Sequence, residues 1–270
     1  MSTYTSNNSK KGVNLSPLEH KLYFGFYEKE VLRNTDAYNI IPNKKTARQI
    51  LFRLKNKGFI MQVRRGLFAI VPAQMIGKDF SIDRFLVASQ LVRPYFISHH
   101  TALEIHGVAE SYLNIAYIST NKISRPLEFQ NISYKIINTK QMFGIEQVQR
   151  GTQVINVSNR ERTVLDCIRN IKYAGGIEEL AKSISAFPGL DHKKLLEYLH
   201  IFKEKSLFHR TGFILDRLKS ELNVPQDFLD SIKENLSKRT YYLHPGTKGV
   251  YKKEWNIIVP DNIEEMMKIA

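Results

Sequence analysis

Residues 43–72 read NKKTARQILFRLKNKGFIMQVRRGLFAIVP and combine a helix pattern with a hairpin pattern in one short stretch. The first half carries an apolar stripe with the i, i+3, i+4 and i+7 spacing of one helix face, made by Ala47, Ile50, Leu51 and Leu54. Gly58 follows at the point where a left-handed residue often ends a helix. The stretch therefore predicts a helix over residues 43–57.

The opposite side of this predicted helix is polar and basic. Its side chains are of the types that reach phosphate oxygens or hydrogen-bond to base edges in the major groove of DNA. They are Lys44, Lys45, Thr46, Arg48, Gln49 and Arg53, with Lys57 at the helix end. We therefore interpret this segment as a recognition helix and expect these side chains to contact DNA.

A hairpin pattern follows the predicted helix. Two strand-like runs, residues 59–63 and 67–71, flank a short basic turn. The turn consists of Arg64, Arg65 and Gly66. A basic hairpin directly after a recognition helix is typical of the wing of a winged helix-turn-helix, so Arg64 and Arg65 are also predicted to contact DNA.

The segment before the recognition helix predicts the other helices of such a domain. The sequence SPLE at residues 16–19 is a helix start, with Ser as the N-cap, Pro at the first position and Glu completing a capping box. The apolar spacing that follows predicts a first helix over residues 17–32 and a short second helix over residues 36–40. Residues 1–15 are interpreted as a flexible tail.

The basic residues are concentrated in the same part of the chain. The 270 residues include 40 Lys or Arg and 26 Asp or Glu, which gives a formal net charge of +14. Residues 1–77 hold 13 of the basic residues against four acidic ones, and residues 43–70 hold eight basic residues and no acidic one. Such a block fits a polyanionic partner, although a basic helix face can also be merely solvated. The order of helices and basic hairpin favours double-stranded DNA, with RNA as the main rival.

The rest of the sequence predicts a second region. Over residues 78–157 strand and helix patterns alternate as in a mixed sheet, residues 158–240 are mainly helical, and residues 241–270 form an extended C-terminal segment. Within the mixed region, residues 145–149 and 153–157 have the spacing of a hairpin around Arg150 and Gly151. A basic loop that holds Lys122 and Arg125 joins the predicted strands 114–119 and 132–137. We therefore expect an α+β protein with a winged helix-turn-helix domain at residues 16–77 and an α+β domain at residues 78–270.

One helix of the second region has a distinctive polar start. Ser158 and Glu161 predict another capping box, and Arg162 and Asp166 lie four residues apart on the same helix. We interpret Arg162 and Asp166 as a buried ion pair that fixes the helix against the sheet.

Histidines cluster in the second region without the pattern of a metal site. His99, His100, Glu104 and His106 fall within eight residues. Their order is not HExxH and no thiolate accompanies them, so we interpret them as packing or capping residues and expect no metal.

The motifs of catalysis and cofactor binding are missing from the sequence. It contains no phosphate-binding GxxxxGK[ST] loop, no GxGxxG after a predicted strand and no GxSxG nucleophile elbow. The single cysteine, Cys167, falls in an apolar helix pattern and is expected in the core. We therefore expect no catalytic residue and no cofactor. The absence of a long apolar run or a signal peptide predicts a cytoplasmic protein that does not enter a membrane.

Three segments resemble one known family. GFIMQVRRGLFAIVP, YFISHHTALEIHGV and VSNRERTVLD begin at residues 58, 95 and 157 and follow the order seen in AbiEi-type antitoxins. The shared features are the Arg-Gly-aromatic hairpin at residues 65–68, the Ser-helix-His-Gly element at residues 98–107, and the Glu-Arg-x-x-x-Asp helix start at residues 161–166.

The resemblance implies a function. AbiEi-type proteins are antitoxins of toxin–antitoxin or phage abortive-infection operons, in which the N-terminal winged helix represses the operon and the C-terminal domain neutralises the toxin. The resemblance therefore implies two partners, operator inverted repeats in duplex DNA and a nucleotidyltransferase-like toxin that is counteracted without a stable complex as a rule. Residues 241–270 extend beyond the shorter members of the family.

Two alternatives remain open from the sequence. The first is a transcription regulator unrelated to any toxin. The second is an enzyme that uses the winged helix only for targeting to nucleic acid. The carboxylates that such an enzyme would need in the C-terminal region lack metal-ligand spacing. They are Asp216, Glu221, Asp227 and Asp230.

Overall fold

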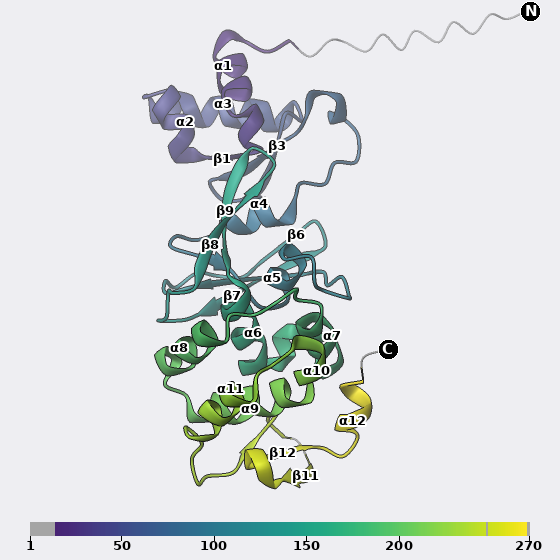
Figure 1. The fold of residues 1–270 in the computed structure, drawn as a ribbon. Coiled ribbons are helices and arrows are strands. Elements are labelled where there is room, and N and C mark those ends of the chain that lie inside the picture. Colours follow the sequence, from purple (N-terminus) through teal and green to yellow (C-terminus); the bar gives the residue numbers. More distant parts are fainter. Residues whose placement is uncertain (1–13, 247, 269–270) are drawn as a thin grey trace, which may run out of the picture. The chain divides into compact units, whose positions relative to one another are not determined.

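The computed structural model describes residues 14–246 and 248–268 (Figure 1). The chain divides into two compact units, residues 1–87 and 88–270. Both units combine helices with sheets, which confirms the expected α+β class. Most of the predicted tail falls on residues 1–13, which lie outside the described residues. Across the described ranges, no helix has both the length and the apolar character needed to cross a bilayer.

The first unit has the element order of a winged helix-turn-helix. Its main helices are α1 (Pro17–Gly25), α2 (Asn34–Ile40) and α3 (Lys44–Asn56), and its strands are β1 (Val31–Arg33), β2 (Ile60–Arg64) and β3 (Leu67–Ile70). In the sheet, β3 lies between β1 and β2 and pairs antiparallel with both. A short turn joins α2 to α3, and the β2–β3 hairpin forms the wing.

The start of α1 matches the prediction, but its end does not. The capping box is present, because the Ser16 amide donates to Glu19 Oε2 (2.7 Å) and the Glu19 amide donates to Ser16 Oγ (3.4 Å). The prediction of one helix as far as residue 32 is wrong. Glu30 adopts a left-handed conformation (φ 57°), and the next residues form β1, which pairs with β3.

The core of the first unit forms where α1 and α3 pack together and cover the sheet. The predicted apolar face of α3 is buried in it, as are residues of the other elements: Leu22, Tyr23, Phe26, Leu32, Ala37, Ala47, Ile50, Leu51, Leu54, Phe59, Ile60, Phe68 and Ile70. The Tyr23 hydroxyl donates to the Val71 carbonyl oxygen at 2.7 Å, which ties α1 to the end of the wing. Burial raises the pKa of Tyr23 to about 12. This packing fixes one face of α3 and leaves the other free.

The second unit begins with a six-stranded mixed sheet in the order β6-β7-β5-β4-β9-β8. Its strands are β4 (Phe96–Ile97), β5 (Ile115–Thr120), β6 (Leu127–Phe129), β7 (Ile132–Asn138), β8 (Ile145–Arg150) and β9 (Gln153–Ser158). β5 pairs parallel with β7, and β4 pairs parallel with β9, while the remaining pairs are antiparallel. The predicted β8–β9 hairpin is confirmed. β6 lies in the segment that was expected to be only a basic loop.

The chain from residue 84 onward contains several helices, and most of them follow the sheet, as predicted (Figure 1). They are α4 (Arg84–Ser89), which spans the unit boundary, α5 (His99–Ile105), α6 (Arg160–Arg169), α7 (Ile177–Ser185), α8 (His192–Phe202), α9 (Lys205–Arg217), α10 (Lys219–Leu222), α11 (Gln226–Lys233) and α12 (Ile263–Met266). The predicted N-cap of α6 is off by one residue. Asn159, not Ser158, caps the helix by accepting a hydrogen bond from the Arg162 amide.

The C-terminal segment is part of the core of the second unit. β10 (Tyr241–Tyr242), β11 (Gly249–Lys252) and β12 (Ile257–Pro260) form a small sheet next to α9. Trp255 is buried, and its indole N–H donates to Asp216 Oδ2 at 3.0 Å. Gly212 of α9 lies under the Trp255 ring, where a Cβ atom would overlap the indole. The segment is therefore integral to the fold.

Candidate nucleic-acid interface

The outer face of α3 is a continuous exposed surface. We define it by the side chains that line a shallow groove on the helix: Lys44, Lys45, Arg48, Gln49, Phe52 and Arg53. All six residues are exposed, and the predicted Thr46 beside them is half-buried. The sequence prediction named every member except Phe52.

The α3 helix begins with a side-chain cap that fixes its first turn. The Asn43 Oδ1 atom accepts hydrogen bonds from the Lys45 and Thr46 amides, both at 3.0 Å. This cap satisfies donors that would otherwise be left without partners at the helix N-terminus. It holds the basic first turn of the outer face in a defined orientation.

The residues of the outer face differ in their angle from the buried stripe of α3, which divides them into central and flanking positions. With 3.6 residues per turn, Lys45 lies about 170° from the centre of the buried stripe, almost directly opposite the core. Gln49 and Phe52 lie about 150° away, one on each side of Lys45. Arg48 and Arg53 lie about 110° away and flank them. A helix with this face in a groove would direct its central residues to base edges and its flanking arginines to the two phosphate backbones.

The positive charge of the outer face is not neutralised by the carboxylates that the structure describes. In the part of the chain that the structure describes, no carboxylate forms an ion pair with Lys44, Lys45, Arg48 or Arg53. The face therefore presents four cations to solvent. This arrangement is suited to a polyanion, because a neutralised face would gain little from one.

Tyr38 of α2 orients the edge of the outer face. Its hydroxyl accepts a hydrogen bond from Arg48 Nε at 3.0 Å, and the Lys44 ammonium lies 5.9 Å from the centre of its ring. Within the helix-turn-helix, α2 therefore holds two cationic side chains of α3 in place. Tyr38 was not among the residues predicted from the sequence, since nothing in the spacing of a seven-residue helix identifies its neighbour on α3.

Lys57 is the predicted contact residue that the structure separates from the others. Its ammonium pairs with the buried Glu19 carboxylate at 2.7 Å and also donates to the Asn14 carbonyl oxygen at 2.9 Å. Burial raises the pKa of Glu19, but the hydrogen bonds from Lys57 and Ser16 outweigh it and bring the pKa below its usual value. Because Lys57 is committed to this pair, the outer face does not include it.

The wing tip carries the remaining predicted residues. Arg64 is half-buried at the end of β2, and burial lowers the pKa of its guanidinium. Arg65 is exposed in the turn. Gly66 completes the turn with φ +81°, and its carbonyl oxygen accepts from the Asn34 amide at 3.0 Å. The tip is therefore anchored to the start of α2, with Arg65 directed to solvent.

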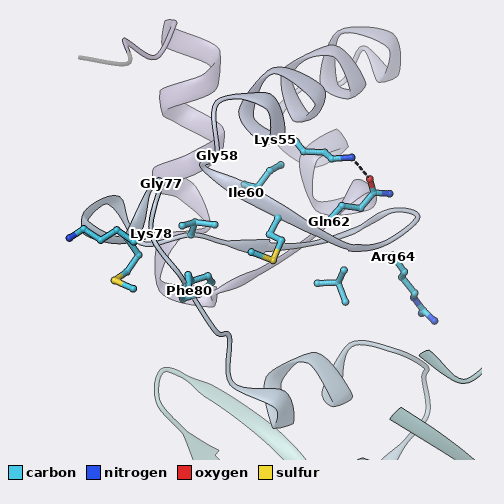
Figure 2. Close-up of a pocket in the computed structure, with 12 residues that line it drawn as sticks. Lys55, Gly58, Ile60, Gln62, Arg64, Gly77, Lys78 and Phe80 are labelled. Carbon is cyan, nitrogen blue, oxygen red and sulfur yellow. Dashed lines mark hydrogen bonds between the residues drawn. The ribbon is translucent and has the colours of Figure 1, made fainter. Parts of the chain in front are cut away.

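A cavity of about 630 Å³ lies along β2 (Figure 2). Lys55 and Arg64 lie on one side of it, and Lys78 and Phe80 come from the segment after β3 (Figure 2). The Lys55 ammonium donates to Gln62 Oε1 at 2.8 Å, which links the last turn of α3 to the wing. This link adds a cation near the wing that the sequence analysis did not include among the contact residues.

Two histidines of the cluster in the second unit, His100 and His106, are hydrogen-bonded within the chain. His100 is buried, with Nδ1 2.9 Å from Glu104 Oε1 and Nε2 3.2 Å from Glu179 Oε1. His106 Nε2 donates to the Ser158 carbonyl oxygen at 2.8 Å. Among the described residues, no group of three or more His, Cys, Asp or Glu side chains is arranged to hold a metal ion.

The predicted ion pair on α6 is confirmed. Arg162 Nε donates to Asp166 Oδ2 at 2.9 Å, and both side chains are buried. The guanidinium also lies over the rings of Phe96, Phe143 and Phe202. Burial raises the pKa of Cys167, the next residue on α6, well above its usual value. These groups have structural roles in the core of the second unit.

The fold and this surface define an α+β protein with an N-terminal winged helix-turn-helix that exposes a basic helix face. Among solved structures, the chain is similar to the RV2827C protein from Mycobacterium tuberculosis, with a TM-score of 0.65 and 13% sequence identity over 94% of each chain. At this identity the similarity supports the fold alone. No protein-family model matches the sequence, and no curated protein matches it.

Proposed function

We propose that this protein binds double-stranded DNA through the outer face of α3 and represses transcription of its own operon. The observation that carries the proposal is the exposed outer face itself, whose cations form no ion pair with described carboxylates. An α-helix fits the major groove of B-form DNA, and side chains of this composition bind there.

The geometry favours duplex DNA over duplex RNA. The major groove of A-form RNA is deep and narrow and does not admit a helix with its side chains. The flanking arginines Arg48 and Arg53 lie on opposite sides of α3 and suit two phosphate backbones across a wide groove. Arg65 at the wing tip would add a further backbone contact.

We further propose that the protein is an AbiEi-type antitoxin that acts in the cytoplasm and counteracts a nucleotidyltransferase-like toxin encoded beside it. The support is the resemblance of three segments, two of which lie in the second unit. There the Ser98 hydroxyl bonds to Ser119 Oγ at 2.7 Å, and Arg162 pairs with Asp166. Both motifs are thus elements of the core that hold the sheet and helices together. The proposal is a binding function and involves no cofactor.

The test of DNA binding uses the full-length protein and duplex DNA from upstream of its own gene. We expect binding that weakens steeply with salt, because phosphate contacts release counterions. A triple variant, Lys45→Ala with Arg48→Ala and Arg53→Ala, should lose most of this binding. Equal binding by the triple variant and the unmodified protein would refute the proposed interface.

The test of the antitoxin proposal is co-expression with the neighbouring gene. We expect the full-length protein to restore growth when that gene arrests it, and we expect the triple variant to restore growth equally while failing to repress a promoter fusion. If the neighbouring gene is harmless, a transcription regulator unrelated to a toxin becomes the better description. Metal-dependent turnover of nucleotide by the purified protein would instead favour the enzyme alternative.

A further inference from the structure

Phe52 is a large apolar side chain at the centre of a basic surface. It is 64% exposed, although burying a phenylalanine side chain fully is worth about 1.5–3 kcal/mol. Its position is about 150° from the centre of the buried stripe, so no small rotation of α3 could bring it into the core. The sequence places a phenylalanine where the solvated face of a helix would carry a polar residue.

The ring of Phe52 has no aromatic or cationic partner within residues 14–246 and 248–268. The exposed Phe24 of α1 is different, because its ring contacts the rings of His20, Tyr23 and Tyr27. Phe24 is therefore part of a local aromatic cluster, whereas the side chains around Phe52 are polar or basic. Its neighbours in the groove are Lys45, Arg48, Gln49 and Arg53.

Among the base edges in the major groove, the one apolar group is the C5-methyl group of thymine. A residue on the side of a recognition helix farthest from the core faces base edges in the groove. Gln49 lies at the same angle as Phe52 on the other side of Lys45, and a glutamine side chain suits adenine, the base that pairs with thymine. We propose that Phe52 is a specificity-determining residue that contacts a thymine methyl group in the DNA site. This inference rests on the proposed function and adds the base that the outer face selects.

The experiment removes the methyl group without changing base pairing. Duplexes that bind the full-length protein are first selected from a pool of random sequences. Each thymine of a selected duplex is then replaced in turn by uracil, which lacks only the C5-methyl group. Affinities are measured for the unmodified protein, for Phe52→Ala, and for Phe24→Ala as a matched control that also removes an exposed phenylalanine.

We expect uracil at one or two positions to weaken binding by the unmodified protein about fourfold, or about 0.8 kcal/mol at 1.4 kcal/mol per tenfold. The Phe24→Ala control should respond in the same way. Phe52→Ala should bind the thymine duplex about tenfold more weakly and be insensitive to the uracil replacement. Such coupling would assign the methyl contact to Phe52, because the loss appears only when both partners are present.

Three results would overturn the inference. Equal uracil effects in Phe52→Ala and in the unmodified protein would show that another residue reads the methyl group, while DNA binding itself would stand. A change in oligomeric state of DNA-free Phe52→Ala, measured by sedimentation velocity, would identify Phe52 as a contact between copies. Failure of the unmodified protein to enrich any duplex would instead refute the proposed function and the inference with it.

Discussion

Glu19 is a carboxylate in the core of the first unit, and Lys57 is the group that makes its burial tolerable. The side chain of Glu19 is almost fully buried, and its partners are the Ser16 amide at the helix start and the Lys57 ammonium. A buried charge without its partner is strongly unfavourable. The pair therefore connects α1 to the end of α3 and fixes the helix that carries the outer face.

Lys57→Ala should lower the free energy of unfolding by about 1–3 kcal/mol, because it leaves the Glu19 carboxylate without its cation. The pKa of Glu19 is depressed in the folded protein, so its contribution is present above the usual Glu pKa and is lost as pH falls through the folded value. In urea unfolding, the difference in the free energy of unfolding between Lys57→Ala and the unmodified protein should therefore be smaller at pH 3 than at pH 7. The matched control Arg48→Ala should change stability by less than about 0.5 kcal/mol. Equal stability of Lys57→Ala and the unmodified protein would contradict this role.

His99 should make the stability of the second unit depend on pH. It is buried in a left-handed conformation (φ 53°), and burial lowers its pKa to about 4. In the unfolded chain a histidine titrates near about 6.5, so the unfolded state binds more protons between these values. Stability should therefore fall, by up to about 3 kcal/mol, as pH drops from about 6.5 to about 4.

His99→Asn tests this account, because asparagine tolerates the left-handed backbone and does not titrate. Its melting temperature should fall less between pH 7 and pH 5 than that of the unmodified protein. Burial also lowers the pKa of His209, so part of the dependence should remain. An unchanged pH dependence would mean that His99 does not contribute.

At the scale of elements, the proposed interface assigns different contacts to the wing and to α3. Arg65 is exposed at the tip of the wing and suits a phosphate contact, whereas the central residues of the outer face of α3 suit base edges. Arg65→Ala should therefore weaken binding about equally on selected and unrelated duplexes and lower the salt slope by roughly one. Fluorescence anisotropy over a series of salt concentrations measures the affinity for each duplex and its salt slope. A loss confined to the selected duplex would contradict a phosphate contact.

The C-terminal segment contributes to the second unit through one close contact. Because Trp255 packs directly on Gly212 of α9, a methyl group at that position would push the indole out of the core. Gly212→Ala should destabilise the second unit by about 1–3 kcal/mol, despite the higher helix propensity of alanine. Thermal unfolding followed by tryptophan fluorescence reports on this, since the chain has one tryptophan. A stabilised variant would show that the segment is not packed in this way.

The elements that sequence predicted well are those with a strong local signal. The apolar period of α3, the capping box of α1 and the β8–β9 hairpin are all present, because each depends on residues close in sequence. β1 was missed, since its three residues form a strand only by pairing with β3. β6 was missed for the same reason, because its pairing with β7 decides its structure.

The residues of the candidate site could be predicted from the sequence, but the hydrogen bonds and ion pairs between them and their neighbours could not. The charged residues of α3 could be assigned to the outer face because the apolar stripe defines the opposite side. The pairing of Lys57 with Glu19 and of Arg48 with Tyr38 depends on how helices pack, which spacing does not reveal. Phe52 carried a signal that was overlooked, namely a phenylalanine outside the apolar stripe.

At the scale of the whole molecule, the proposed DNA-binding surface lies in the first unit, and the proposed antitoxin function is assigned to the second. The first unit is small, yet it contains the exposed cations of α3 and the wing. The second unit has its own core, which extends from α5 to the C-terminal sheet. Two compact units with separate cores are compatible with repression by one and neutralisation of a toxin by the other.

The most direct test of the central claim is chemical footprinting of a selected duplex with dimethyl sulfate, which methylates guanine N7 in the major groove and adenine N3 in the minor groove. If the outer face of α3 lies in the major groove, the full-length protein will protect guanine N7 positions within the site. The triple variant with Lys45, Arg48 and Arg53 replaced by alanine will not protect them. Protection confined to adenine N3, or identical guanine protection by the triple variant, would contradict the claim.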